Sequence, residues 1–100
     1  MIKMVRDNIP AIIVAEGKEP KYVQVEDISP YVREKLQEEL NEVLNAPSKD
    51  NLTVELADLL EVMIKYGELN GIEFDAVLEA MIEKSERVGG LDNNTLLEFE

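Results

Sequence analysis

The sequence of 100 residues contains no cysteine, no histidine and no tryptophan, and only 5% of its residues are aromatic. Without cysteine there is no disulfide framework and no thiolate metal site. Without histidine, nucleophile–histidine pairs, imidazole zinc sites and the usual general base near neutral pH are excluded. Any catalysis must therefore use carboxylates, amines, guanidinium groups, phenols or hydroxyls.

Basic residues are also scarce. Ten lysines and arginines stand against 22 aspartates and glutamates, which gives a formal net charge of −12. Such a charge argues against a nucleic-acid partner, because phosphates require a basic face. No apolar run approaches the roughly 18 residues of a membrane span, and no signal-peptide core follows the first residues. The expectation is a cytoplasmic enzyme or binding protein with no nucleic-acid or membrane partner.

The remaining composition suits a single helical domain over residues 1–100, since 45% of the residues are apolar. Glycine, proline and asparagine divide the chain into helical segments with short loops. Helices are expected over about residues 8–16, 30–44, 52–69 and 73–88. Asp7 and Ser29 are the expected N-caps of the first two. Weak alternation over residues 21–25 suggests a short β pairing with residues 95–99. The expected fold is an all-α antiparallel helical bundle.

The third expected helix is apolar around almost its whole circumference at 100° per residue. Its apolar residues are Leu52, Val54, Leu56, Ala57, Leu59, Leu60, Val62, Met63, Ile64, Tyr66 and Leu69. A helix that is apolar all round is buried all round, and one chain of this length can hardly cover it. The sequence therefore predicts that the bundle is completed by homo-oligomerisation.

Two pairs of carboxylates lie at or within apolar helix faces, so they are not explained as residues of a solvent-exposed face. Glu39 borders the apolar stripe of the second helix and Glu42 lies one turn later, whereas Glu55 projects into the apolar arc of the third, one turn before Asp58. An ionised carboxylate on a buried helix costs several kcal/mol unless it is compensated. In an antiparallel hairpin the two pairs converge, because residues three apart share a helix face. All-oxygen ligands select a hard cation, Mg²⁺ or Mn²⁺, over zinc.

The acidic pattern belongs to a longer resemblance. Residues 38–42 (EELNE) and, after twelve residues, 55–58 (ELAD) resemble the E-E-x-x-E … E-x-x-D signature of the all-α nucleotide pyrophosphohydrolases. This MazG-like superfamily includes the phosphoribosyl-ATP pyrophosphohydrolases and the dimeric dUTPases. Residues 3–13 (KMVRDNIPAII) resemble the K-L-V-R-D-K-I-P-x-I-I opening of a short MazG-like branch, and residues 84–91 resemble its K-x-x-x-R-G-G-F ending. The resemblance thus spans almost the whole chain.

The resemblance implies Mg²⁺-dependent hydrolysis of a nucleoside triphosphate between its α and β phosphates. Glu38 would be an outer carboxylate that orients or deprotonates the attacking water. The implied metal ligands are Glu39, Glu42, Glu55 and Asp58. The implied phosphate contacts are the basic residues near the two ends, Lys3, Arg6, Lys84 and Arg87. For Arg6 and Lys84, structural ion pairs or the shielding of helix ends are an equally good explanation. Homodimers or homotetramers, usual in the superfamily, agree with the apolar third helix.

Other interpretations stay open. The substrate is either a nucleoside triphosphate, including a non-standard one removed in a house-cleaning reaction, or phosphoribosyl-ATP of histidine synthesis. A non-catalytic helical module, whose carboxylates bind a metal for dimer stability or contact a partner, is the alternative from another class. Without the apolar surroundings of Glu55, the glutamate pairs would be ordinary surface residues.

Overall fold

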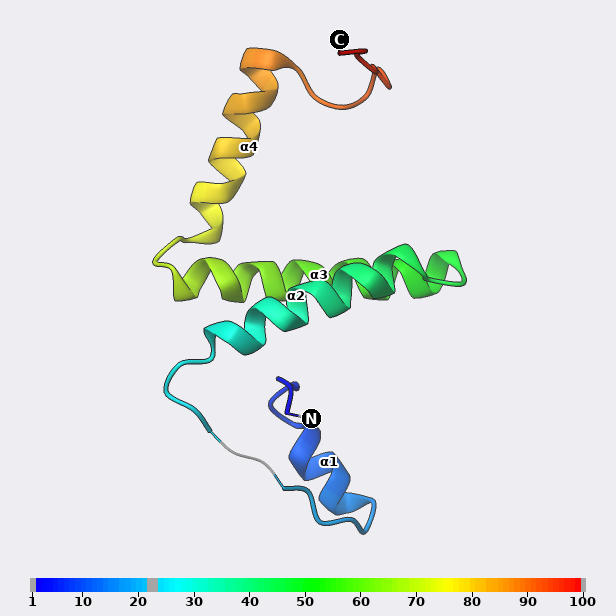
Figure 1. Ribbon diagram of the computed structural model, residues 1–100, viewed down its shortest axis with the longest axis vertical. Coiled ribbons are helices and arrows are strands. Elements are labelled where there is room, and N and C mark those ends of the chain that lie inside the picture. Colours follow the sequence, from blue (N-terminus) through cyan, green and yellow to red (C-terminus); the bar gives the residue numbers. More distant parts are fainter. Residues whose placement is uncertain (1, 22–23, 100) are drawn as a thin grey trace.

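In the computed structural model, which describes residues 2–21 and 24–99, those residues form four α-helices and no strand (Figure 1). The helices are α1 (Ile9–Ala15), α2 (Ser29–Leu44), α3 (Lys49–Leu69) and α4 (Phe74–Val88). The predicted all-α class is confirmed. No helix in the described part of the chain is both long enough and apolar enough to cross a bilayer.

The centre of the fold is an antiparallel pair of helices, α2 and α3, joined by a short loop (Figure 1). The side-chain oxygen of Ser48 caps α3 by accepting a hydrogen bond from the backbone nitrogen of Asn51 at 3.1 Å. Because of this cap, α3 begins one turn earlier than the apolar pattern predicts. Val32 and Val62 are the buried apolar side chains of the described residues. The core is therefore a thin seam between the two helices.

The first helix begins one residue after its predicted start, and the second begins one residue before its predicted start. The N-cap position of α1 is Asn8 rather than Asp7, and that of α2 is Ile28 rather than Ser29. At α2 the reason is Asp27, whose Oδ1 accepts a hydrogen bond from the Ser29 backbone nitrogen at 3.0 Å. Because the Asp27 carboxylate accepts this hydrogen bond from two residues upstream, Ser29 can belong to the first turn of the helix.

The predicted β pairing between residues 21–25 and 95–99 is not found in the described residues. Residues 24–25 and 95–99 form no strand, and residues 22–23 lie outside the described part. The reason is the direction of α4. After Gly71, which adopts a φ of +72°, α4 carries the C-terminal segment to the end of the molecule opposite α1 (Figure 1). The two segments therefore do not meet.

The whole chain is open rather than compact. Its radius of gyration is 17.8 Å, whereas a compact domain of 100 residues has about 13 Å. Projecting from one end of α3, α4 has no buried residue, and α1 lies on the other side of the pair (Figure 1). Apolar residues of α3 that do not face α2, such as Val54 and Met63, are about half exposed. The apolar surface of α3 is thus covered on one side only.

Candidate functional site

Three carboxylates meet on the seam between α2 and α3. Glu39 and Glu42 come from successive turns of α2, and Glu55 comes from the first half of α3. One oxygen atom of each lies within 4.8 Å of the others. The short α2–α3 loop reverses the chain, so the end of α2 lies beside the start of α3. The structure therefore brings together three of the four carboxylates that the sequence predicts as metal ligands.

Glu39 is the buried member of this carboxylate cluster (Glu39, Glu42 and Glu55), with only 4% of its surface exposed. Lys35 Nζ lies 3.4 Å from one of its oxygens. Its other oxygen, and one oxygen of Glu55, are buried with no hydrogen-bond partner among the described residues. Burial and the neighbouring Glu42 raise the pKa of Glu39 and outweigh the opposing effect of Lys35. The fold thus leaves negative charge on this seam incompletely compensated.

This donor set fits a hard divalent cation. An unpartnered buried acceptor costs about 1–3 kcal/mol, and more when it is charged. A cation between the helices would satisfy the free oxygens of Glu39 and Glu55 together, with Glu42 as a third ligand. Because the ligands are all carboxylate oxygens, Mg²⁺ or Mn²⁺ suits them better than a softer metal.

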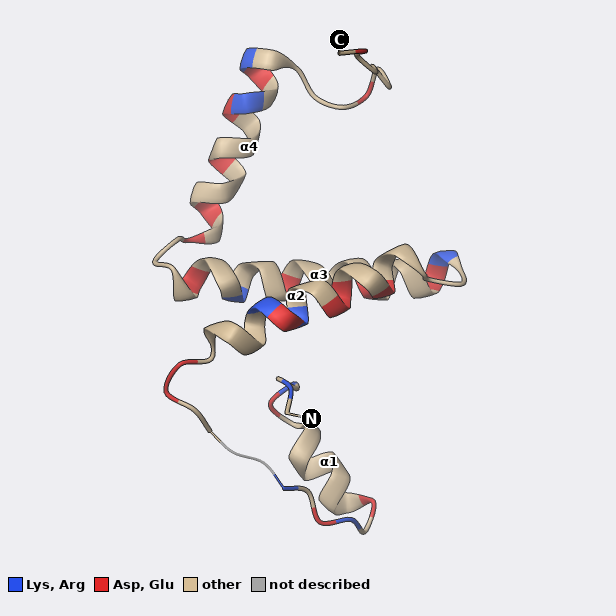
Figure 2. Cartoon of the chain, viewed as in Figure 1, with Lys and Arg blue, Asp and Glu red and all other residues tan. Residues whose placement is uncertain are grey.

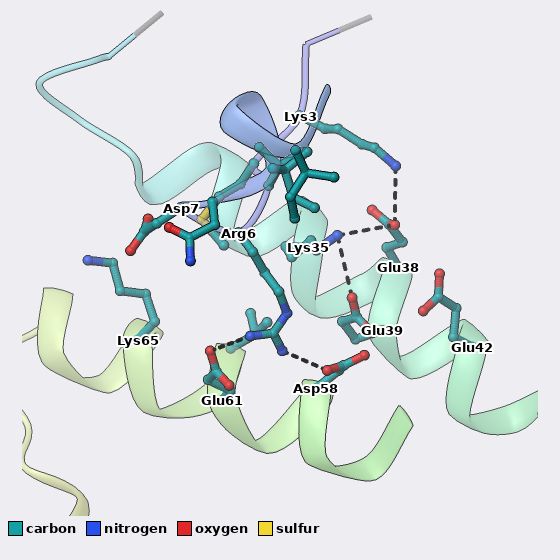
Figure 3. A pocket seen from close by; sticks show the side chains of 16 residues that line it. Lys3, Arg6, Asp7, Lys35, Glu38, Glu39, Glu42, Asp58, Glu61 and Lys65 are labelled. Carbon is teal, nitrogen blue, oxygen red and sulfur yellow. Dashed lines mark hydrogen bonds and ion pairs between the residues drawn. The ribbon is translucent and has the colours of Figure 1, made fainter. Parts of the chain in front are cut away.

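Asp58 lies one turn after Glu55, but its carboxylate pairs with an arginine from the N-terminal segment. Arg6 Nη2 donates to Asp58 Oδ1 at 2.7 Å, and Arg6 Nη1 donates to Glu61 Oε2 at 2.9 Å (Figure 3). Hydrogen bonds to Asp58 and then to Glu61 raise the pKa of Arg6 further above its ordinary value. Asp58 is not one of the three residues with closely spaced oxygens. Its role as a fourth metal ligand stays a prediction.

Glu38 faces the same site from α2, between two lysines (Figure 3). Its Oε1 lies 3.4 Å from Lys3 Nζ and 3.3 Å from Lys35 Nζ. Burial raises the pKa of Glu38, but the two lysines together outweigh burial and leave its pKa below the ordinary value. A carboxylate with a lowered pKa is a weaker base. The role of Glu38 as an outer carboxylate that orients or deprotonates water stays a prediction.

A cavity of about 870 Å³ is lined by Glu38, Glu39, Glu42, Asp58, Lys3 and Arg6, whereas Glu55 is not among its lining residues. It lies between the N-terminal segment and the α2–α3 pair (Figure 3). Cavities of roughly 300–1,000 Å³ are typical of small-molecule sites. Both walls carry mixed charge: Lys3, Arg6 and Asp7 come from the N-terminal segment, and the helices contribute Lys35 and Lys65 beside their carboxylates. Figure 2 shows acidic residues along α2 and α3, with a few basic residues on the same helices and near the N-terminus.

Lys84 and Arg87 are not among the residues that line this cavity. Both are exposed on the last turns of α4, which projects away from the α2–α3 pair (Figure 1). Within one protomer the structure therefore does not bring these two predicted phosphate contacts to the site. Lys3 and Arg6, by contrast, do line it.

Glu61 is a site residue that sequence reasoning missed. Because it follows Asp58 by three residues, it shares a helix face with Asp58, and this spacing was the available signal. No local pattern indicates that Arg6, separated from the two acids by 52 and 55 positions, lies between them. That contact depends on how the N-terminal segment crosses α3.

The profile of the phosphoribosyl-ATP pyrophosphohydrolase family matches residues 12–85. The matched stretch covers about three quarters of the chain and contains α2, α3 and the whole carboxylate cluster. No curated protein and no solved structure matches the chain at a significant level. The extent of the profile match, together with an all-helical fold that places the acidic signature on one helix pair, shows that the chain belongs to the phosphoribosyl-ATP pyrophosphohydrolase family.

Proposed function

We propose that the protein hydrolyses a phosphoric anhydride bond of a nucleotide and releases pyrophosphate, with Mg²⁺ at the carboxylate cluster. The observation that carries this proposal is the pair of buried, unpartnered oxygens of Glu39 and Glu55 beside Glu42. The family membership supports the reaction class, because pyrophosphohydrolysis is the activity that the family's description names. Manganese is the alternative ion, since it accepts the same oxygen ligands.

The proposed roles follow from the position of each side chain. Glu39, Glu42 and Glu55 would hold the ion, with Asp58 as a further ligand once it is free of Arg6. When bound, a divalent cation neutralises phosphate oxygens and activates water for attack. Lys3 and Arg6, on the opposite wall of the cavity, would bind the phosphates. Held by lysines, Glu38 would orient the attacking water.

A nucleoside triphosphate, standard or non-standard, is the substrate that we propose. Cleavage would then give the monophosphate and pyrophosphate. Phosphoribosyl-ATP is the second candidate, favoured by the description of the matching family. The cavity volume suits a ligand of this size class but does not distinguish the two. We further propose that this activity is cytoplasmic.

The test is pyrophosphate release from a panel of standard and non-standard nucleoside triphosphates and phosphoribosyl-ATP, with and without Mg²⁺. We expect release from at least one of them with Mg²⁺ and none in excess chelator. Glu55→Gln should abolish release without unfolding the protein, as measured by circular dichroism. Glu68→Gln is the matched control, because Glu68 is exposed on the same helix, away from the cavity. Mg²⁺-dependent melting with no release from any nucleotide would instead support a non-catalytic metal-stabilised module.

We propose further that the protein works as a homodimer or homotetramer. The single chain exposes 9106 Å², which is about 3,400 Å² more than a compact monomer of its mass exposes. Obligate interfaces bury roughly 1,000–2,500 Å² on each partner, so a second copy can account for most of this excess. The exposed apolar side chains of α3 and α4 supply such a surface. In such an assembly, Lys84 and Arg87 would act at the site of a neighbouring subunit.

A further inference from the structure

The N-terminal strap (residues 2–8) lies on one side of the α2–α3 pair, where its residues 3–8 line the cavity (Figure 3). Within the described residues, its backbone makes no hydrogen bond to α2 or α3. Nor does α1, which follows it, bury any residue. The directed contacts of the strap are ion pairs, and those of Arg6 with Asp58 and Glu61 are the shortest of them. Arg6 thus makes the shortest ion pairs between the strap and the helix pair, and Lys3 adds a longer one to Glu38.

The two acceptors of Arg6 differ in their surroundings. Asp58 lies one turn from Glu55 and is the predicted fourth metal ligand. Glu61 lies one further turn along α3, belongs to no predicted ligand set and has a mostly exposed side chain. In Figure 3 the guanidinium stands between them, so one edge faces the cluster and the other faces away from it. Of the two partners of Arg6, only Asp58 has a second predicted role, as a metal ligand.

A guanidinium is a planar fork with several donors, so it can exchange one acceptor while it keeps another. Phosphate oxygens match this fork as well as a carboxylate does. If Asp58 serves as a metal ligand, its pair with Arg6 opens when the ion and the nucleotide are present. The pair of Arg6 with Glu61 has no such reason to open. Glu61 can therefore hold the strap in place throughout.

We infer that Glu61 is a positioning residue, which holds Arg6 at the cavity while its guanidinium passes from Asp58 to a phosphate oxygen of the nucleotide. The inference rests on the proposed function and adds to it the residue that keeps a substrate contact in position. Arg6 precedes residues 12–85, so the family match itself assigns no role to this pair.

The experiment compares Glu61→Gln with the control Glu68→Gln and uses two readouts. The first is the KM and kcat of pyrophosphate release on the best nucleotide found for the unsubstituted protein. The second is the steady-state ¹⁵N–¹H nuclear Overhauser effect of the Arg6 side-chain Nε, measured without nucleotide, which reports nanosecond motion of the guanidinium. Arg33 is exposed on α2 and makes no ion pair within the described residues, so it is an internal reference.

We expect Glu61→Gln to raise KM on the order of tenfold, with kcat changed less than about twofold. The same substitution should lower the Overhauser effect of Arg6 toward that of Arg33. Glu61→Asp, which keeps the charge, should restore most of both values. A folded, active Glu61→Gln protein with unchanged KM and unchanged Arg6 motion would overturn the inference alone. An unsubstituted protein that releases no pyrophosphate would overturn the proposed function and this inference with it.

Discussion

Glu39 is the residue with the strongest electrostatic conflict in the structure. It is buried on the seam of the α2–α3 pair, where Lys35 compensates one of its oxygens and nothing in the described residues compensates the other. Burial and Glu42 raise its pKa, which means that the fold disfavours the ionised form that a metal ligand needs. The ionised Glu39 side chain can therefore bind a cation, but without one it lowers the stability of the folded protein.

Replacing Glu39 by glutamine should therefore make the metal-free protein more stable. The amide removes a buried charge and its repulsion with Glu42 while keeping the shape of the side chain. A gain of about 1 kcal/mol in the free energy of unfolding would raise the melting temperature by roughly 4–8 °C in a domain of this size. Thermal unfolding in excess chelator measures it, with Glu68→Gln as control. A lower melting temperature for Glu39→Gln would contradict the clustered-charge argument. Added Mg²⁺ should stabilise the original protein and have little effect on the variant.

Asp58 should behave differently because its charge is already paired. Asp58→Asn removes the acceptor of the 2.7 Å contact with Arg6, so we expect no gain in metal-free stability. Loss of a predicted metal ligand should lower the rate of pyrophosphate release by orders of magnitude. Comparison of melting temperature and release rate with those of Glu39→Gln checks both expectations. A stability gain equal to that of Glu39→Gln would mean that Arg6 does not compensate Asp58.

At the scale of elements, the α2–α3 hairpin determines which carboxylates meet. Ser48 ends the loop and caps α3, and the start of α3 sets the position of Glu55 opposite Glu39. Loss of a serine cap costs about 0.5–2 kcal/mol. We expect Ser48→Ala to lower the free energy of unfolding by about 1 kcal/mol. Urea unfolding monitored by circular dichroism measures this loss. An unchanged midpoint would show that the hairpin contacts alone fix the start of α3.

Much of this arrangement could be predicted from local patterns. The carboxylate spacing and a short reversing loop were enough to predict that Glu39, Glu42 and Glu55 converge, because helix periodicity determines which residues share a face. Periodicity was also enough to place α4, whose predicted start at Glu73 differs from the structure by one residue. The start of α3 was predicted too late, since the capping hydroxyl of Ser48 lies ahead of the apolar pattern.

Contacts between distant segments could not be predicted in the same way. The pairing of Arg6 with Asp58 and Glu61 depends on the path of the N-terminal strap, which no periodic pattern encodes. The β pairing of residues 95–99 failed for a related reason. The apolar face of α4 predicts that it packs against another surface but does not indicate where that surface lies. Within this chain, α4 contacts only the end of α3 among the described helices and buries none of its residues.

At the scale of the whole molecule, the open shape predicts assembly. The apolar face of α4 includes Met81 and Ile82, which are both more than half exposed. We expect light scattering to give the mass of two or four chains, and the melting temperature to rise with protein concentration. Met81→Glu should shift the mass toward that of one chain, because it places a charge on the face that the proposed assembly would bury. Glu83→Gln, on the polar face of α4, is the matched control. An unsubstituted protein that stays monomeric at micromolar concentration would contradict the proposed assembly.

The thin α2–α3 hairpin has a kinetic consequence. The carboxylates of the cluster lie within residues 39–55, and contacts between residues close in sequence form early in folding. In the proposed assembly, by contrast, the apolar faces of α3 and α4 become covered only when separate chains meet. Ion binding would then be first order in the chain and first order in Mg²⁺, and it would precede an association step that is second order in the chain. Dilution would slow maturation only after the ion is in place, whereas scarcity of magnesium would delay it at every concentration.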